Sequence, residues 1–199
     1  MYEVLYSNIT DELVNNGYII VKKALGLELN KSLLMLCQDE IGFSQAGISA
    51  ANNVHTNSLK RRDSTRWLDE DMHAQSEFLA FAKGLQLYLN RHLYLGLSYY
   101  ESHFAIYKEG DFYEKHLDVF ANFKNRVVTT VYYLNEEWTP GDGGELLIYD
   151  IEGNLIQKVI PESGTLVIFL SERFPHEVLP AKKKRHSIAG WFRIDKIAV

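Results

Sequence analysis

The sequence predicts a mainly β protein in which helices precede and support an antiparallel β-sandwich or barrel. Before residue 98 the apolar residues recur with helical spacing, whereas from Tyr99 onward they form short runs rich in β-branched and aromatic residues. Turn-forming Pro, Gly, Asn and Asp residues separate these runs. The chain also lacks the alternation of strands and helices that builds a parallel sheet.

The N-terminal half is expected to hold three helices. Residues 11–16 and 27–41 show helical spacing on either side of the short apolar run at 18–21, and Thr10 is a candidate N-cap for the first helix. A broad apolar face at about 75–93 predicts the third helix. These helices should pack against a sheet.

Seven apolar runs in the C-terminal half are the expected strands. The turn sequence TPGDGG must end one strand before Glu145, and EGN at 152–154 suits a hairpin reversal between two others. We therefore expect a meandering antiparallel order. In chain order, the runs are SHFAIY, NRVVTTVYYL, GELLIYD, LIQKVI, GTLVIFL, HEVLP and HSIAGWFRI.

Length and composition limit the organisation of the chain. Its 199 residues, 46% of them hydrophobic, are enough to bury one substantial core. We expect one domain over 1–199, with 1–97 as mainly helical support and 98–195 as the β core.

Charge and cysteine content narrow the classes of partner. The net charge of −5 argues against a nucleic-acid-binding protein, and no apolar run is long enough for a membrane span. The N-terminus also lacks the basic and apolar segments of a signal peptide. Cys37 is the single cysteine and is expected to be a buried apolar residue in a reducing compartment. A cytoplasmic location is expected.

Two histidines and one aspartate suggest a metal site. His116 and Asp118 lie two residues apart in an expected strand, where their side chains share a face and both reach one ion. His176 lies near the end of a later strand. Two imidazoles and a carboxylate form the facial triad of non-haem Fe(II) oxygenases, which leaves three positions open. A zinc hydrolase uses similar ligands and is the alternative. We expect His103 and His186 to be hydrogen-bonded strand residues instead.

Arg185 suggests a carboxylate ligand beside that metal. A guanidinium holds a carboxylate through two parallel hydrogen bonds. Arg185, Ser187 and Ala189 share one face of the last expected strand, which would place the arginine deep in the barrel. The lysines at 182–184 fit a solvated turn.

Beyond these residues, the chain resembles the 2-oxoglutarate and Fe(II)-dependent oxygenases, and within them the prolyl hydroxylases of the bacterial and animal oxygen-sensing type. The resemblance is densest from 107 to 192 and follows the chain in order. It implies a double-stranded β-helix, which is a cupin-like jelly roll with flanking helices. The segments that carry it are RRDSTRWL, FAIYKEGDFYEKHLD, NRVVTTVYYLNEEW, GGELLIYD and PHEVLPAKKKRHSIAGWF.

The resemblance also implies roles for residues around the metal. His116, Asp118 and His176 would bind Fe(II), and O2 and 2-oxoglutarate would be cosubstrates with ascorbate as reductant. Arg185 would pair with the distal carboxylate of 2-oxoglutarate. The remaining cosubstrate-pocket residues would be Tyr133, Tyr107 and Trp191. Tyr132 faces the opposite way from Tyr133 and is expected in the core.

A second group of residues is implied to meet the substrate. Arg61, Asp63 and Trp67 lie in a segment resembling the finger loop that covers the bound peptide in this family, and Arg126 matches an arginine beside the substrate entrance. The chain is shorter than the animal enzymes in this region.

Together these features predict a dioxygenase that hydroxylates a prolyl residue in a protein and produces succinate and CO2. By family analogy the substrate belongs to the translation machinery, with elongation factor Tu as the suggestion. Hydroxylation of a free amino acid or small metabolite is the first alternative. A cupin-like module that binds metal and carboxylate without turnover is the second.

Overall fold

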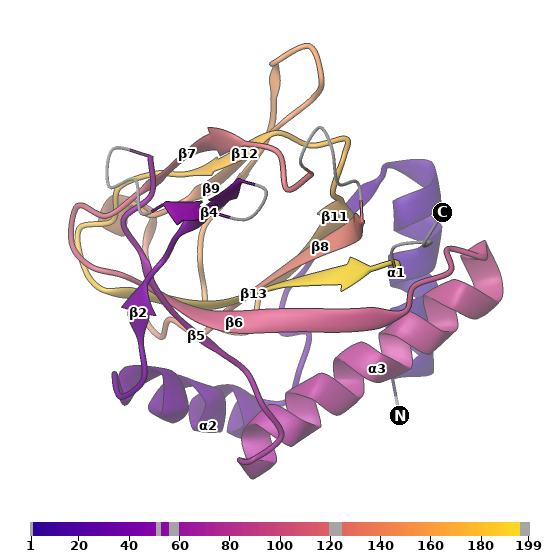
Figure 1. The fold of residues 1–199 in the computed structure, drawn as a ribbon, viewed down its shortest axis with the longest axis horizontal. Coiled ribbons are helices and arrows are strands. Elements are labelled where there is room, and N and C mark those ends of the chain that lie inside the picture. Colours follow the sequence, from indigo (N-terminus) through magenta and orange to yellow (C-terminus); the bar gives the residue numbers. More distant parts are fainter. Residues whose placement is uncertain (1, 51–52, 56–59, 120–124, 196–199) are drawn as a thin grey trace.

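The computed structural model describes residues 2–50, 53–55, 60–119 and 125–195 (Figure 1). Within them, three α-helices lie beside a large antiparallel sheet, and a smaller sheet stacks over the other face of the large one. This is the jelly-roll arrangement that the sequence predicted. Among the described residues, no helix is both long and apolar enough to span a membrane.

The three helices are α1 (Glu3–Asn15), α2 (Leu27–Gln38) and α3 (His73–Leu93). The prediction that the first helix begins near residue 11 was wrong, because Thr10 lies inside α1 and its buried hydroxyl donates to the Tyr6 carbonyl at 2.8 Å. Thr10 is therefore no N-cap. The second helix ends three residues before the expected position at 41.

The large sheet takes strands from both halves of the chain and is antiparallel throughout. Its last strand in the sequence lies near the middle, between strands that precede it by some 60 and 85 residues along the chain. In spatial order the strands are β1 (Tyr18–Val21), β11 (Leu166–Leu170), β8 (Arg126–Tyr133), β13 (Arg185–Arg193), β6 (Tyr99–Tyr107), β5 (Ser64–Trp67) and β2 (Ser44–Gln45).

The small sheet confirms one predicted turn and overturns the predicted strand order. Asp150 and Gly153 bond through their main chains at 3.1 Å, so the reversal at 152–154 is the expected hairpin. The meander was wrong, because the chain crosses between the sheets and thereby buries both inner faces in one core. The sheet order is β10 (Leu155–Val159), β9 (Leu146–Tyr149), β12 (His176–Val178) and β7 (Tyr113–His116). A separate pair joins β3 (Ile48–Ala50) and β4 (Asn53–His55), and a 3-10 turn, Pro140–Asp142, lies before β9.

Two apolar clusters cover the two faces of the large sheet. The cluster on the helix side includes Tyr132, whereas the cluster between the sheets includes Tyr133, as strand alternation predicts. Cys37 is buried in the helix-side cluster, and burial raises the pKa of its thiol to about 12. It is the unreactive core residue that the sequence suggested.

Candidate functional site

A cavity of about 670 Å³ opens between the two sheets. Strand alternation directs side chains from β6, β8 and β13 into it on one side, and β7 and β12 contribute the other side. Of the residues singled out in the sequence, Asp63 and Tyr133 are buried and do not line the cavity. The others line it, namely His116, Asp118, His176, Arg185, Tyr107, Trp191, Arg61, Trp67 and Arg126.

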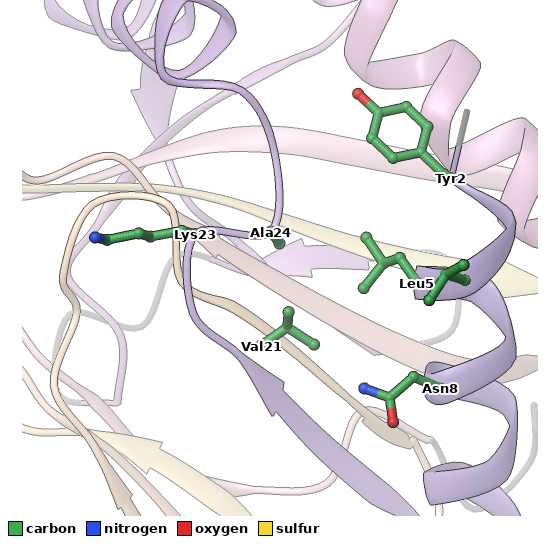
Figure 2. A pocket seen from close by; sticks show the side chains of 7 residues that line it. Tyr2, Leu5, Asn8, Val21, Lys23 and Ala24 are labelled. Carbon is green, nitrogen blue, oxygen red and sulfur yellow. The ribbon is translucent and has the colours of Figure 1, made fainter.

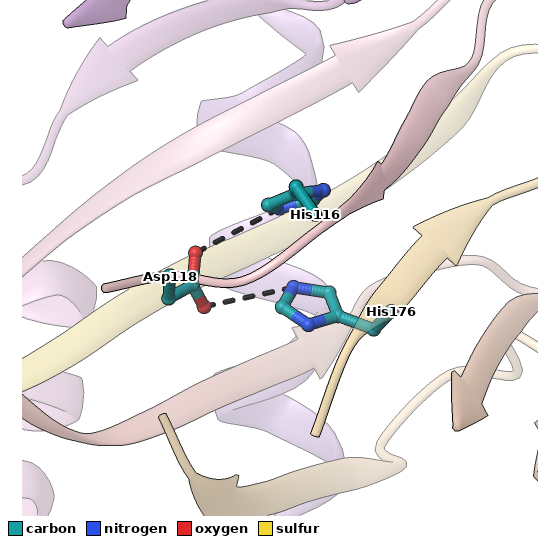
Figure 3. Close-up of side chains that lie close together, drawn as sticks. All are labelled: His116, Asp118 and His176. Carbon is teal, nitrogen blue, oxygen red and sulfur yellow. Dashed lines mark ion pairs between the residues drawn. The ribbon is translucent and has the colours of Figure 1, made fainter. Parts of the chain in front are cut away.

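His116, Asp118 and His176 converge at one wall of this cavity (Figure 3). Their candidate ligand atoms all lie within 4.8 Å of one another. The Nε2 atoms of His116 and His176 lie 3.7 and 3.6 Å from the two carboxylate oxygens of Asp118. Ligand atoms bonded to one ion at about 2.1 Å and right angles lie about 3 Å apart. Small side-chain rotations would therefore bring these three onto one metal.

Backbone pairing positions the two histidines. β12 pairs with β7, and His176 and His116 are direct partners across that pair. The Nδ1 atoms contact the carbonyl oxygens of Phe174 and Glu114 at 3.0 and 2.7 Å. A carbonyl only accepts a hydrogen bond, so Nδ1 carries the proton in each ring and Nε2 keeps its lone pair for the metal.

Asp118 reaches the site in a different way from that expected. β7 ends at His116, and Asp118 lies in the bend that follows, so the two residues do not share a strand. The Thr129 hydroxyl donates to Oδ2 of Asp118 at 2.8 Å and lies 2.9 Å from the Ser171 hydroxyl. Burial alone would raise the pKa of Asp118, but His176, His116 and Arg126 outweigh it and lower the pKa. The carboxylate is thus held ionised, as a metal ligand requires.

Thr129 and Ser171 were not anticipated. Thr129 lies on the inward face of β8, two residues before Val131. A polar residue between Val127 and Val131 on the inward face of β8 was the signal that could have identified it. Ser171 follows β11 and carried no comparable signal.

Arg185 begins β13 and is only 1% exposed. Its Nε donates to the Gly144 carbonyl at 3.0 Å and its Nη1 to the Ser187 hydroxyl at 3.2 Å. No carboxylate pairs with it anywhere in the described part of the chain. A guanidinium has five N–H donors, and a buried charge is costly without a counter-ion. The arrangement therefore fits an anionic ligand.

Two tyrosines complete this anion pocket. The ring centroids of Tyr107 and Tyr133 lie 4.8 and 4.9 Å from the Arg185 guanidinium carbon. The buried Tyr133 hydroxyl finds no hydrogen-bond partner within the described residues. Burial raises the pKa of Tyr133, although the charge of Arg185 opposes the shift, so the phenol stays protonated and able to donate. A ligand carboxylate would satisfy both Arg185 and Tyr133.

Arg61 and Asp63 form a buried pair beside the cavity. The Arg61 Nε and Nη2 atoms donate to the two Asp63 oxygens at 2.5 and 2.8 Å, and Asp63 is 0% exposed. Burial lowers the pKa of Arg61, but Asp63 outweighs this effect and keeps the guanidinium charged. The guanidinium also lies 4.6 Å from the Tyr113 ring centroid. Arg61 therefore reaches the cavity while Asp63 holds it from behind.

The outer end of the cavity is aromatic and charged. The Arg126 guanidinium lies 3.7 Å from the Trp191 ring centroid and 3.4 Å from Glu101. Trp67, at the rim, is 56% exposed. This open end differs from the buried end at Arg185 and could admit a larger molecule.

The two other strand histidines differ from each other. The His103 Nδ1 contacts the Phe104 carbonyl at 3.1 Å, as expected for a hydrogen-bonded strand residue. The prediction fails for the His186 ring, because its buried Nε2 has no partner among the described residues. The His186 main-chain N–H donates to the Asn135 side chain at 2.6 Å, and the His186 carbonyl accepts from the Leu134 N–H at 3.2 Å. Neither histidine belongs to the metal cluster.

A second, more open hollow lies between α1 and the end of β1, next to Lys23 and Ala24 (Figure 2). Tyr2, Leu5 and Asn8 form its α1 side. None of the described residues that line it is a histidine, a cysteine or a carboxylate, so they include none of the usual metal ligands.

Known proteins share this fold, and a family model matches the part of the chain that carries the site. The model of the 2OG-Fe(II) oxygenase superfamily matches residues 102–193, which contain the triad and Arg185. A prolyl-4-hydroxylase structure from Pseudomonas putida superposes with a TM-score of 0.87 at 36% identity, over 96% of this chain and 99% of that one. The chain belongs to the prolyl 4-hydroxylase family of 2OG-Fe(II) oxygenases.

Three animal proteins are also similar to this chain. A Trichoplax adhaerens prolyl hydroxylase, solved with a hypoxia inducible factor peptide fragment, gives a TM-score of 0.83 at 28% identity over 96% of this chain and 90% of that one. The Caenorhabditis elegans hypoxia-inducible factor prolyl hydroxylase is 39% identical over 95 residues, or 46% of this chain and 13% of its own. Human Egl nine homolog 1 is 36% identical over 85 residues, or 42% of this chain and 20% of its own. The match thus spans a small part of the Caenorhabditis elegans and human proteins.

Family membership and the triad imply Fe(II) and 2-oxoglutarate at this site. His116, Asp118 and His176 would hold the metal, which supplies the oxidising chemistry when bound. The protein's own residues orient the ligands, keep Asp118 ionised and exclude water from the buried end. The zinc hydrolase alternative is therefore set aside.

Proposed function

We propose that this protein hydroxylates a prolyl residue in a protein substrate, using O2 and 2-oxoglutarate and producing succinate and CO2. The observation that carries the proposal is the placement of the His116, Asp118 and His176 triad and the unpaired Arg185 charge in one cavity. A metal bound by the triad and a dicarboxylate bound by Arg185 would then lie in the same cavity. The family relationship then favours a prolyl substrate.

The cosubstrate roles follow from the buried end of the cavity. Arg185 and the Tyr133 hydroxyl would bind the distal carboxylate of 2-oxoglutarate. Among the described residues Arg185 bonds only neutral acceptors and the Tyr133 hydroxyl has no hydrogen-bond partner. Tyr107 would pack against the carbon chain, and Trp191 would form the wall toward the outer end. Ascorbate would serve as the reductant that keeps the iron in the Fe(II) state.

The outer end supports a peptide as the substrate. Trp67 is largely exposed at the rim, and the charged Arg126 reaches Asp118 at 3.8 Å from one side of the entrance. An open, charged rim suits a polymer that extends beyond the cavity, whereas a sealed cavity would suit a free amino acid. Arg61 would line the peptide's path, with Asp63 as its positioning residue.

By analogy with the family, we propose proteins of the translation machinery as targets, with elongation factor Tu as the suggestion. The single buried Cys37 suits a reducing compartment, so we propose that the reaction occurs in the cytoplasm.

The test combines a cosubstrate assay with mass spectrometry. The purified protein is incubated with Fe(II), ascorbate, 2-oxoglutarate and air, in the presence of cell lysate or prolyl peptides. We expect succinate above background and the mass gain of one oxygen atom on a proline. His116→Ala should abolish both signals, whereas His92→Ala, an exposed change on α3, should leave them unchanged.

Three other results would separate the alternatives. Succinate with an oxygen atom gained only by a free amino acid or metabolite would favour a small-molecule hydroxylase. Tight binding of Fe(II) and 2-oxoglutarate without succinate in any extract would favour a non-catalytic cupin-like module. A lack of 2-oxoglutarate binding would refute the assignment of Arg185.

A further inference from the structure

His103 is a buried polar residue of the cavity to which the proposed chemistry assigns no role. It lies on β6, is 4% exposed and lines the cavity. Its direct strand partners are Trp67 on β5 and Ala189 on β13. The imidazole lies between two indoles, with centroid distances of 5.3 Å to Trp67 and 5.4 Å to Trp191.

The strand register places His103 toward the Trp191 end of the cavity and away from the Arg185 end. Along β13, Ala189 lies four residues after Arg185, which corresponds to about 13 Å of strand. Thr129, which holds the metal ligand Asp118, pairs across the sheet with Trp191, two residues beyond Ala189. His103 therefore lies toward the end of the cavity where Thr129 holds Asp118.

The hydrogen bonding of His103 defines what its ring can offer. Nδ1 lies 3.1 Å from the Phe104 carbonyl oxygen, which only accepts, so Nδ1 carries the proton. Nε2 is then an acceptor, and no described residue donates to it. Burial, and next the charge of Arg61, lower the pKa of His103 to about 4, so the ring is neutral near pH 7.

Two other acceptors of the cavity already have partners or roles. Oε1 of Glu101 accepts from Arg193 at 2.7 Å and from Arg126 at 3.4 Å. Asp118 is a metal ligand. A peptide that enters between the two indoles loses contact with water, and each of its buried N–H groups then needs an acceptor. Proline has no N–H, so the donors come from the flanking residues.

We infer that His103 is a specificity-determining residue whose Nε2 accepts a hydrogen bond from a main-chain N–H of a residue flanking the target proline. The inference rests on the proposed peptidyl-prolyl substrate. This hydrogen bond would make the site selective for a proline within a peptide chain, because free proline and small cyclic amines have no flanking residue to supply the main-chain N–H.

The test uses three blocked, alanine-rich nonapeptides with one central proline. One peptide is unmodified, and the other two are methylated at the amide nitrogen of the residue before or after the proline. Binding to the full chain is measured without O2, in the presence of Mn(II) and 2-oxoglutarate, by the change in tryptophan fluorescence. Wild type should bind the unmodified peptide about tenfold more tightly than one of the methylated peptides, which is the size expected for one buried hydrogen bond.

Variants of His103 then show whether it is the acceptor. His103→Met, which removes the acceptor and keeps the volume, should bind all three peptides alike while its affinity for 2-oxoglutarate stays unchanged. His103→Gln, which restores an acceptor oxygen, should recover a preference for the unmodified peptide. The matched surface change His92→Met should keep the full preference.

Two results would overturn the inference for different reasons. If wild type shows no preference for the unmodified peptide, or if His103→Met keeps that preference, His103 is not the acceptor. The proposed function would be unaffected by either result. Failure of wild type to bind any of these peptides, although it binds 2-oxoglutarate, would remove the peptidyl-prolyl substrate together with the inference.

Discussion

Replacement of Arg185 by Met separates a ligand-binding arginine from a structural one. Methionine keeps much of the length and apolar volume of the side chain but removes the charge and all five donors. Arg185 is buried and bonds only neutral acceptors, the Gly144 carbonyl and the Ser187 hydroxyl. We therefore expect the substitution to reduce the affinity for 2-oxoglutarate strongly and to change the stability of the ligand-free protein little.

The loss of 2-oxoglutarate affinity should be large. Each hydrogen bond to a charged group contributes about 1.5–3 kcal/mol, so loss of a two-donor contact with a carboxylate should cost about 4 kcal/mol. At about 1.4 kcal/mol for each factor of ten, the dissociation constant should rise by about a thousandfold. The unfolding free energy of the ligand-free protein should change by less than about 1 kcal/mol, because relief of the unpaired buried charge offsets the two lost neutral bonds.

Calorimetric titration with 2-oxoglutarate under argon, with Mn(II) at the metal site, measures the first quantity, and urea unfolding measures the second. Arg173→Met is the matched control, because Arg173 is exposed and lies over the Phe174 ring, away from the cavity. An affinity within about threefold of wild type would refute the assigned role. A loss of more than about 3 kcal/mol in the ligand-free protein would show instead that Arg185 is structural.

Three further predictions concern the groups behind the site. Thr129→Val should weaken metal binding by about 10–100-fold, because it removes the hydroxyl donor that orients Asp118. A Co(II) titration followed by absorbance measures this affinity, and an unchanged value would contradict the role of Thr129. Asp63→Asn should lower the unfolding free energy by about 3–5 kcal/mol, because it leaves the charge of Arg61 buried without its partner; a loss below 1 kcal/mol in urea unfolding would contradict this. Burial lowers the pKa of His186 from 6.5 to about 4 in the folded protein. As pH falls from 6.5 to 4, the His186 ring therefore takes up a proton in the unfolded chain before it does so in the folded protein, and the unfolding free energy should fall by roughly 2 kcal/mol. His186→Asn should flatten this decrease in urea unfolding measured from pH 7 to 4, and an equally steep profile would exclude His186 as its source.

Residue type and local period were enough to predict much of the fold and of the inner site. The alternation of Tyr132 and Tyr133 predicted which ring lies between the two sheets, because neighbouring strand residues point to opposite faces whatever their partners. The type of ligand likewise follows from chemistry, since two imidazoles and a carboxylate suit Fe(II). Arg185 was informative because it begins an apolar strand, where a charged side chain is rarely buried unless it is paired.

Contacts between distant segments were decided only by the tertiary structure. His176 meets His116 through the register of β12 against β7, and the sequence contains no local signal for that register. Asp118 reaches the metal site from a bend whose geometry depends on Thr129, a residue of another strand. The strand order was also nonlocal, because it is set by burying two sheet faces at once rather than by any single turn.

The sequence by itself thus determined the chemical groups of the site and the strands that carry them, because both depend on residue type and on neighbours one or two positions away. The tertiary structure decided what surrounds those groups. It showed that Arg185 has no counter-ion among the described residues, that Asp63 pairs with Arg61, and that His103 lines the cavity and contacts two indoles. Burial and unsatisfied hydrogen bonds arise only when distant strands pack together, so no local pattern in the sequence could reveal them.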